Sequence, residues 1–415
     1  MVLLFVWLGI GMAERYYGVV EMPLLGEKPI LGGSDFPAFY AGSKLFFADT
    51  SHAYDADAQT RAILAAKGYG PEHEEKGSQW YRYYNPPVYS VLLAPLTLFE
   101  VRTAFALTLL INAAGLYLLL RVLSDILGQR RELFPSVATA VILFVPVNYA
   151  FWHAQPTLFL AALFGLALAS AEKSRKARTG VYWALLVVKP HWLIVPPFAL
   201  DWRKPRLLTS LLLVTGALLL PFLAIGPQGI RDYVQLTLSR GHGDLTDASF
   251  AEAVLSWSGF LRGLTGEAQT SSAIVMSILT LAVFAIVWRR GGVERMALAA
   301  PLTLLLVVPH SHPQDWIMLA PGAVFLLRGQ QGAPLVFSAA LLLGVVIGLH
   351  NWAGLERSDQ AFYWPTLMGF LLLVWLAVLS RIEARPRDSS PSLHYVELAD
   401  VIERRPARSS VGHLA

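Results

Sequence analysis

Long apolar runs separated by short polar connections dominate the hydrophobic pattern of this chain. Most runs are about 15–20 residues long, which is close to the length that an α-helix needs to cross the hydrocarbon core of a bilayer. The pattern therefore predicts an all-α polytopic membrane protein with about 10 transmembrane helices. The predicted helices cover residues 2–20, 103–121, 135–152, 156–171, 206–225, 272–289, 296–310, 316–328, 333–350 and 362–380.

Two further apolar stretches, 88–99 and 180–200, are too short or too interrupted for a simple crossing. The first follows the aromatic sequence WYRYYNPP, and only one crossing fits before the next basic connection, so we expect an interfacial helix. The second has basic residues at both ends, whereas a single helix would place those ends on opposite sides of the membrane. It is predicted to be a re-entrant segment broken at Lys189, Pro190 and His191, because freed backbone groups are tolerated where they line a protein cavity. The alternative is that one of the two basic clusters is external.

The distribution of charge along the connections predicts which side of the membrane each one faces. Lysine and arginine concentrate in alternate connections, and the positive-inside rule places these in the cytoplasm together with both termini. The remaining connections carry more acidic than basic residues, so the sign of the charge reverses between the two sides. The basic connections begin near Arg121, Lys173, Arg203, Arg289 and Arg381.

The same topology predicts a simple domain organisation. Residues 1–381 form one transmembrane domain, in which 21–102 is the first extracytoplasmic loop and 226–271 is the second large one. Residues 382–415 form a polar tail rich in proline and serine, which we expect to be disordered in the cytoplasm.

Composition supports the membrane class and excludes several functions. Hydrophobic residues make up 55% of the 415 residues and charged residues only 15%, whereas soluble domains carry about 25% charged residues. The chain has no cysteine, which excludes disulfides, cysteine-based metal sites and a thiol nucleophile. The basic residues are dispersed among short loops, so nucleic acid is not an expected partner. P-loop, GxGxxG, GxSxG and HExxH motifs are absent.

Polar residues from separate segments fall on the predicted extracytoplasmic face. Ionisable groups at membrane depth are costly and are usually functional. The candidates are Asp35 in the first loop, Arg82 near its end, His153 and Gln155 in one turn, Lys189 and His191 at the re-entrant tip, and His310, His312, Gln314 and Asp315 in another turn.

Each candidate also has a structural interpretation. Asp35 precedes a proline and is a candidate helix N-cap, and Lys189 is a candidate snorkelling residue. Arg82 lies among tyrosines and fits an interfacial aromatic belt as well as a phosphate contact. Single histidines in turns are commonly solvated, and the pair His310 and His312 lacks a third spaced ligand for a metal. We therefore expect no metal site.

The motifs SDFPAFYAGS, YNPPVYSVLLAPL, HAQPT, VKPHW and HSHPQDW occur in this order. Together they resemble the bacterial membrane glycosyltransferases of family 87, which include polyprenyl-phosphate-mannose-dependent alpha-1,2-mannosyltransferases. The similarity extends from about Gly32 to Pro321. It implies the GT-C fold, an active site on the outer face of the bacterial cytoplasmic membrane, and inverting transfer with Asp35 as general base. The late turn departs from the mannosyltransferase pattern, because both histidines, His310 and His312, precede the tryptophan. The resemblance therefore does not assign a role to these two histidines or identify the transferred sugar.

This resemblance implies a transferase that moves a hexose or pentose, such as mannose, from a polyprenyl-phosphate donor to a cell-envelope glycan or glycolipid. Because the leaving group is a phosphate monoester, we expect no cofactor or metal. The alternatives are a glycan polymerase or ligase that uses a lipid diphosphate, a transporter or flippase for lipid-linked sugars, and a silent lipid-binding paralogue. The predicted phosphate-binding residues are Lys189, Arg82, His312 and His310. The predicted substrate-binding residues are Tyr40, His153, Gln155, His191, Gln314 and Asp315.

Overall fold

The computed structural model describes residues 34–69, 83–194, 205–246, 254–267, 269–309, 311–330, 332–355 and 364–382. Within these ranges the ordered elements are helices and no β-strand is present, so the predicted all-α class is confirmed for this part of the chain. The predicted first helix 2–20 and nearly all of the predicted tail lie outside the described residues.

The described ranges contain long helices, short helices and 3-10 turns. In chain order, the first elements are α2 (Phe36–Ala48), the 3-10 turn η2 (Thr50–His52), α3 (Ala56–Ala66), α4 (Pro87–Leu93), η5 (Ala94–Leu98), α5 (Val101–Leu127), η6 (Gly128–Leu133), α6 (Phe134–Ile142), α7 (Val145–Trp152) and α8 (Thr157–Glu172). They are followed by α9 (Lys176–Ala184), η7 (Leu185–Val188), η8 (Pro190–Ile194), α11 (Pro205–Leu219), α12 (Pro221–Thr246), α14 (Trp257–Thr265), α15 (Thr270–Arg290), α16 (Val293–Val307), η9 (Pro313–Met318), α17 (Leu319–Gly329), α18 (Ala333–Leu355) and α19 (Trp364–Ile382).

Three helical stretches in the described part are long and apolar enough to cross a membrane: Val101–Ile142, Thr270–Arg290 and Trp364–Ile382. The pair α11 and α12 adds a fourth candidate if its two helices, which are bent by 65°, count as one span. These lengths are typical of a polytopic membrane protein. The predicted total of about ten spans stays a prediction.

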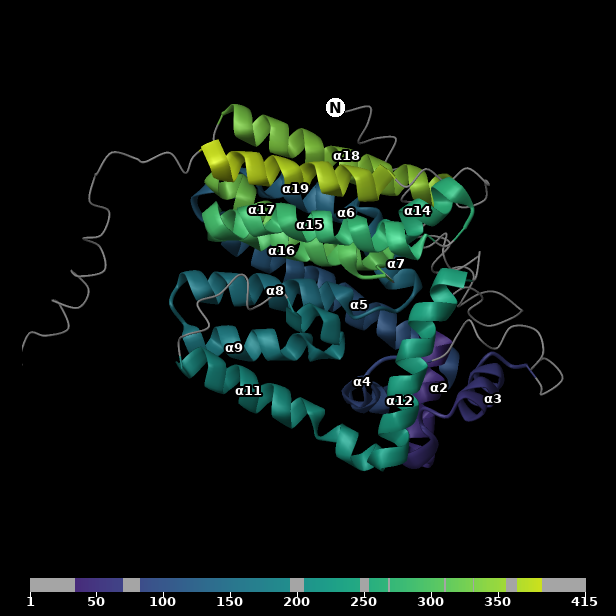
Figure 1. Ribbon diagram of the computed structural model, residues 1–415. Helices are drawn as coiled ribbons and strands as arrows, with labels where there is room; N and C mark the ends of the chain where they lie inside the picture. The colour runs from purple at the N-terminus through teal and green to yellow at the C-terminus, as the bar shows by residue number, and fades with distance from the viewer. Residues whose placement is uncertain are drawn as a thin grey trace, which may run out of the picture.

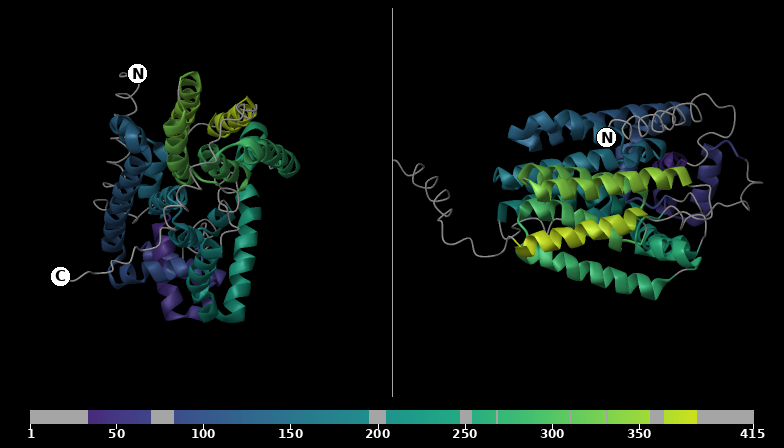
Figure 2. Two further views of the ribbon diagram at one scale, coloured as in Figure 1. Left: turned by 90° about the vertical axis from the view of Figure 1, so that its left-hand side faces the viewer. Right: turned by 90° about the horizontal axis from the view of Figure 1, so that it is seen from above.

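The apolar helices form a bundle, and the N-terminal elements lie at one end of it. In Figure 1, α5, α8, α9 and α15 to α19 run side by side, whereas α2, α3, α4 and α12 lie at the right-hand end. The view from above in Figure 2 places α2 and α3 at the same end. Helix α5 packs against α8, and α16 packs against α17. A methyl group added at Gly322 of α17 would overlap the carbonyl oxygen of Ala297 in α16, so this glycine permits close helix approach.

Two predicted continuous helices are broken, and proline explains both breaks. The segment predicted as 135–152 divides into α6 and α7, because Pro146 has no N–H to bond the carbonyl oxygen four residues earlier and its ring would clash with that carbonyl group. The new helix starts at Val145, and Phe144 before it is extended with ψ of 115°. The segment predicted as 206–225 ends as α11 and begins again as α12 at Pro221. Helix α12 then continues to Thr246, so part of the predicted second loop is helical.

The two interrupted stretches adopt short helices. The stretch 88–99 forms α4 and η5, and the stretch 180–200 is broken at Lys189, whose backbone is extended with φ of −123° and ψ of 91°. The break therefore lies where the sequence predicts it. The interfacial position of the first stretch and the re-entrant path of the second stay predictions.

The connections predicted to be cytoplasmic meet at one end of the bundle. Arg328, in the last turn of α17, donates two hydrogen bonds to the carboxylate of Glu172 at the end of α8, with lengths of 3.0 and 2.7 Å. It also lies 3.7 Å from Glu294 in the first turn of α16. Arg130 of η6 donates to the carbonyl oxygen of Leu327 over 2.9 Å. These contacts agree with the alternation of the basic connections, while the side of the membrane that they face stays a prediction.

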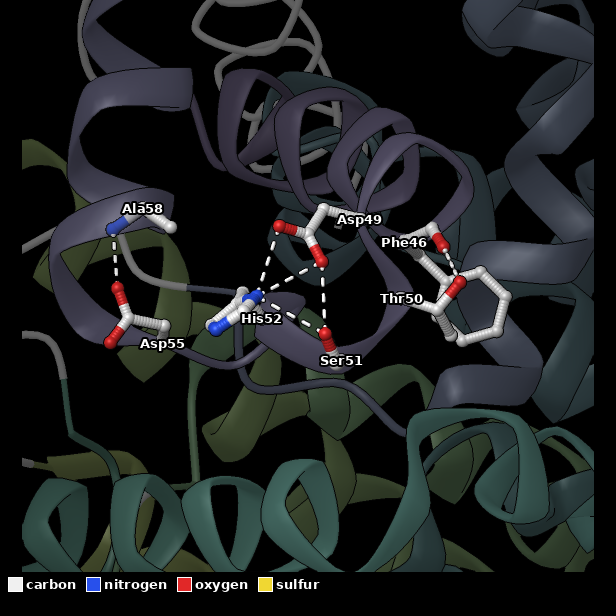
Figure 3. Close-up of polar contacts among 7 residues, drawn as sticks. All are labelled: Phe46, Asp49, Thr50, Ser51, His52, Asp55 and Ala58. Atoms are coloured by element: carbon white, nitrogen blue, oxygen red, sulfur yellow. Dashed lines mark hydrogen bonds and ion pairs between the residues drawn. The ribbon is translucent and has the colours of Figure 1, made fainter.

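A hydrogen-bonded turn reverses the chain between α2 and α3 (Figure 3). The Thr50 hydroxyl donates to the carbonyl oxygen of Phe46 over 2.8 Å, and the Asp49 carboxylate lies 2.9 Å from Nδ1 of His52. Asp55 caps α3 by accepting a hydrogen bond from the backbone of its first turn. This reversal packs α3 back along α2.

Candidate functional site

Asp35 lies directly before the first turn of α2, but its side chain does not cap that helix. The hydroxyl of Ser34 instead accepts a hydrogen bond of 3.2 Å from the Phe36 N–H. The Asp35 side chain is 36% exposed. The structure therefore does not support the N-cap interpretation, and it leaves the carboxylate directed at other partners.

Those partners come from the turn after α7. The side-chain nitrogen of Gln155 donates a 2.7 Å hydrogen bond to Oδ2 of Asp35, and Nδ1 of His153 lies 3.5 Å from Oδ1. Ala154 between them has a φ of 53°, which turns the chain sharply and presents both side chains on one side. The ring of Tyr149 stacks on His153 with centroids 5.6 Å apart. The turn thus holds both oxygens of the carboxylate.

Charge around Asp35 favours its ionised form. Burial raises the pKa of this carboxyl. Three neighbours together lower the pKa by more: His153 through its charge and hydrogen bonding, His312 through its charge, and Gln155 through its hydrogen bond. The net pKa lies well below the ordinary value of an aspartate. Asp35 is consequently unprotonated at neutral pH, which is the form that can accept a proton.

A second carboxylate is held in a buried ion pair. Nζ of Lys189 lies 2.6 Å from Oδ1 of Asp315, and the two side chains are 10% and 5% exposed. Lys189 stands at the extended break between η7 and η8, and Asp315 lies in η9. Burial raises the pKa of Asp315, but the charges of Lys189 and His191 lower it by more than burial raises it. The net pKa of Asp315 is therefore below its usual range. Asp315 is therefore ionised, and this buried carboxylate depends on the neighbouring ammonium group of Lys189 for compensation.

His312 connects the two carboxylates electrostatically. Its charge lowers the pKa of Asp35 and also the pKa of Asp315. Its backbone N–H lies 3.4 Å from Oδ2 of Asp315, within the capping box of η9. Gln314 lies in the same turn and is buried. Because η9 packs on both α7 and α8, the two polar turns meet at one end of the bundle.

The other predicted site residues have different positions. The hydroxyl of Tyr40 donates a 2.8 Å hydrogen bond to the carbonyl oxygen of Phe99, which ties α2 to the end of η5. His191 lies in η8, and its charge acts on Asp315. Arg82 and His310 lie outside the described residues.

Two residues near Asp35 are missing from the sequence-based set. Lys67, at the end of α3, is 8% exposed, and Tyr89 of α4 is 5% exposed. Burial lowers the pKa of Lys67 to about 8, and the nearby Asp35 opposes that shift. Burial and the charge of Asp35 both raise the pKa of Tyr89. The signal in the sequence is weak, because each residue lies within or beside an apolar run whose packing partner is not visible.

The described residues contain no group of three or more histidine, aspartate or glutamate side chains that could hold a metal ion. The polar side chains that the structure places at the site are two carboxylates, two buried lysines, three histidines and two glutamine amides. Such a set can accept a proton, bind an anion and hydrogen-bond hydroxyl groups.

The helical fold and this polar end define a polytopic membrane protein with a potential catalytic site at one end of its bundle. The family model for glycosyltransferase family 87 matches residues 83–313, which is more than half of the chain. The chain belongs to glycosyltransferase family 87. The matched residues include His153, Gln155, Lys189 and His312, whereas Asp35 lies before them. No curated protein and no solved structure matches the chain.

Proposed function

We propose that this glycosyltransferase moves a sugar from a polyprenyl-phosphate donor to a hydroxyl group of an extracytoplasmic glycan or glycolipid, with inversion at the anomeric carbon. The observation that carries the proposal is the ionised, partly exposed Asp35, held by Gln155 at 2.7 Å and approached by His153 at 3.5 Å. A carboxylate fixed in this way can accept a proton from an entering hydroxyl group.

The proposed reaction is one displacement. The acceptor oxygen attacks the anomeric carbon as Asp35 takes its proton, and the bond between that carbon and the phosphate oxygen breaks. The departing polyprenyl phosphate gains one negative charge, which nearby cations stabilise. We assign this role to His312 and Lys189, and, by the sequence, to Arg82 and His310. The protonated Asp35 then releases its proton to water.

The remaining polar side chains are proposed to bind the sugars. Gln155 and His153 orient the base. His191 of η8 and Gln314 and Asp315 of η9 lie on the two segments that the Lys189–Asp315 ion pair joins. Tyr40 would contact a sugar through its aromatic ring, since its hydroxyl group already donates a hydrogen bond to the backbone carbonyl oxygen of Phe99. The proposed extracytoplasmic location of the site rests on the positive-inside rule, which places the basic connections on the other side of the membrane.

A transfer assay tests this function. The purified chain in detergent is given radiolabelled polyprenyl-phosphate-mannose and octyl α-mannoside, and in parallel a lipid-diphosphate oligosaccharide. We expect labelled disaccharide with inverted anomeric configuration from the monophosphate donor. Product from the diphosphate donor alone would favour a polymerase or ligase. Absence of product from every polyprenyl-phosphate sugar, together with uptake of the lipid-linked sugar into proteoliposomes, would favour a transporter.

The contact between His153 and Asp35 predicts a pH effect. Because His153 lowers the pKa of Asp35, His153→Asn should raise that pKa, and the base would be protonated at a higher pH. The acid limb of the profile of kcat/KM against pH should therefore move to higher pH. His52→Asn removes a similar histidine–aspartate contact at the exposed turn after α2 and should leave the limb in place. An unchanged limb in His153→Asn would contradict this role.

A further inference from the structure

Three buried polar atoms on the stretch that holds Asp35 have no hydrogen-bond partner in the part of the chain that the structure describes. They are Nδ2 of Asn148, Oε1 of Gln155 and Oγ1 of Thr157, whose residues are 4%, 6% and 0% exposed. Proteins satisfy the large majority of their buried polar side-chain atoms, so each exception needs an explanation. A ligand that completes these hydrogen bonds would account for all three.

The contact with Asp35 fixes the position of the unused Gln155 oxygen. Nε2 of Gln155 donates a 2.7 Å hydrogen bond to Oδ2 of Asp35, and Oε1 is bonded to the same carbon atom as Nε2. Oε1 therefore lies next to the Asp35 carboxylate. The backbone N–H of Gln155 bonds to the carbonyl oxygen of Ala150 over 2.9 Å, which ties this residue to α7. A fixed hydrogen-bond acceptor thus stands beside the proposed base.

Thr157 begins α8 two residues after Gln155. Because consecutive Cα atoms are about 3.8 Å apart, the Cα atoms of these two residues lie within about 8 Å of each other. Buried threonines inside other helices, such as Thr108 and Thr303, donate to the carbonyl oxygen four residues earlier over 2.8 Å. The first residue of a helix has no earlier helical turn to bond in this way. The Thr157 hydroxyl is therefore available to a ligand at the turn that binds Asp35.

The hydrogen-bonding character of the three atoms indicates the chemistry of that ligand. Oε1 of Gln155 can only accept, Nδ2 of Asn148 can only donate, and the Thr157 hydroxyl can do both. A phosphate diester offers only acceptors, so it cannot satisfy Gln155, and the ionised Asp35 repels it. Each hydroxyl group of a sugar both donates and accepts. The set therefore fits the hydroxyl groups of a sugar better than an anion.

We propose that Gln155 and Thr157 bind a second hydroxyl group of the acceptor sugar, next to the hydroxyl that Asp35 deprotonates, an assignment that rests on the proposed function. This second hydroxyl donates to Oε1 of Gln155 and accepts from the Thr157 hydroxyl. Because Gln155 also holds Asp35, the contact fixes the attacking oxygen relative to the base. The acceptor is then selected for two neighbouring hydroxyl groups, since an analogue without the second would leave buried polar atoms unpaired.

Binding of octyl α-mannoside to the full-length protein in nanodiscs tests this subsite without requiring transfer. Thr157→Val nearly keeps the shape of the side chain and should weaken binding by about 3- to 10-fold, as expected for loss of one neutral hydrogen bond. Thr157→Ser keeps the hydroxyl and should retain most of the affinity. Thr179→Val is the matched control, because Thr179 is also fully buried but its hydroxyl bonds to the carbonyl oxygen of Arg175 over 3.2 Å.

Deoxy sugars and thermal unfolding distinguish recognition from a structural role. Among the monodeoxy octyl α-mannosides, one should bind the wild type more weakly than the parent sugar, and this difference should shrink in Thr157→Val. Without sugar, Thr157→Val should unfold at a higher temperature than the wild type, because it removes a buried hydroxyl that has no partner. A hydroxyl bonded within the protein, or to a structural water, would give a lower temperature.

The proposal would be overturned by unchanged sugar binding in Thr157→Val, by an equal loss in Thr179→Val, or by a lower unfolding temperature in Thr157→Val. Failure of the wild type to bind octyl mannoside, glucoside or galactoside would also overturn it. A loss of affinity confined to polyprenyl phosphate would do the same, because it would assign this turn to the donor. Sugar binding by a wild type that transfers nothing would refute the proposed function and leave the subsite standing, whereas transfer with an unchanged acceptor KM in Thr157→Val would refute the subsite alone.

Discussion

Asp35→Asn is expected to abolish sugar transfer while the protein still inserts and purifies normally. Asparagine has nearly the same shape as aspartate, and it can still hydrogen-bond to Gln155, but its amide does not accept a proton from a hydroxyl group. Loss of a general base commonly lowers the rate by about 10²- to 10⁴-fold. Transfer from radiolabelled polyprenyl-phosphate-mannose, measured beside thermal unfolding of the same preparation, provides the comparison.

The matched control for this variant lies at the other end of α2. Asp49 is an exposed aspartate that contacts a histidine, His52, at 2.9 Å, as Asp35 contacts His153. Asp49→Asn should therefore leave the transfer rate close to that of the wild type. Full activity in Asp35→Asn would refute the proposed base. Equal losses in both variants would show that the first loop is sensitive to any loss of charge.

The lengths of the most apolar helices could be predicted from the sequence. The predictions 103–121, 272–289 and 362–380 correspond to α5, α15 and α19 within a few residues, except that α5 continues to Leu127. Apolar length alone decides such segments, because a lipid-facing helix must be apolar over the thickness of the bilayer. Where α5 ends depends on Gly128, whose φ of 56° suits a helix terminus.

Breaks inside apolar runs were harder to predict. Pro146 and Pro221 stand inside runs that are otherwise suitable for one helix each. Proline in a membrane helix can be accommodated as a kink or can divide the helix, and packing against neighbours decides between them. The break at Lys189 was predictable because basic residues flank both ends of that stretch, so charge supplied the information that hydropathy lacked.

The candidate site was predictable in part, through topology. Placing His153, Gln155 and His312 in turns on the same side as Asp35 was sufficient to expect that they meet, and the structure brings them together. The direct pairing of Lys189 with Asp315 was not predictable, because it requires η8 and η9 to approach within one hydrogen bond. Lys67 was missed for a related reason, since its position depends on how α3 packs against α2.

Lys189→Met is expected to destabilise the protein and to abolish transfer. The ammonium group is 2.6 Å from Asp315, and both side chains are almost fully buried. Removing one partner leaves a buried carboxylate without compensation, which typically lowers the free energy of unfolding by about 3–5 kcal/mol. Thermal unfolding followed by intrinsic fluorescence in detergent measures the first effect, and the transfer assay measures the second.

The double variant Lys189→Met/Asp315→Leu separates stability from chemistry. It removes both charges, so that stability should recover to a large extent, but transfer should remain slow if Lys189 stabilises the departing phosphate. The corresponding control is Arg328→Met/Glu172→Gln, which removes a more exposed pair at the opposite end of the bundle and should change stability by at most about 1 kcal/mol. If the double variant at Lys189 and Asp315 transferred sugar at the wild-type rate, the ion pair would be structural alone, and the phosphate-binding role of Lys189 would be wrong.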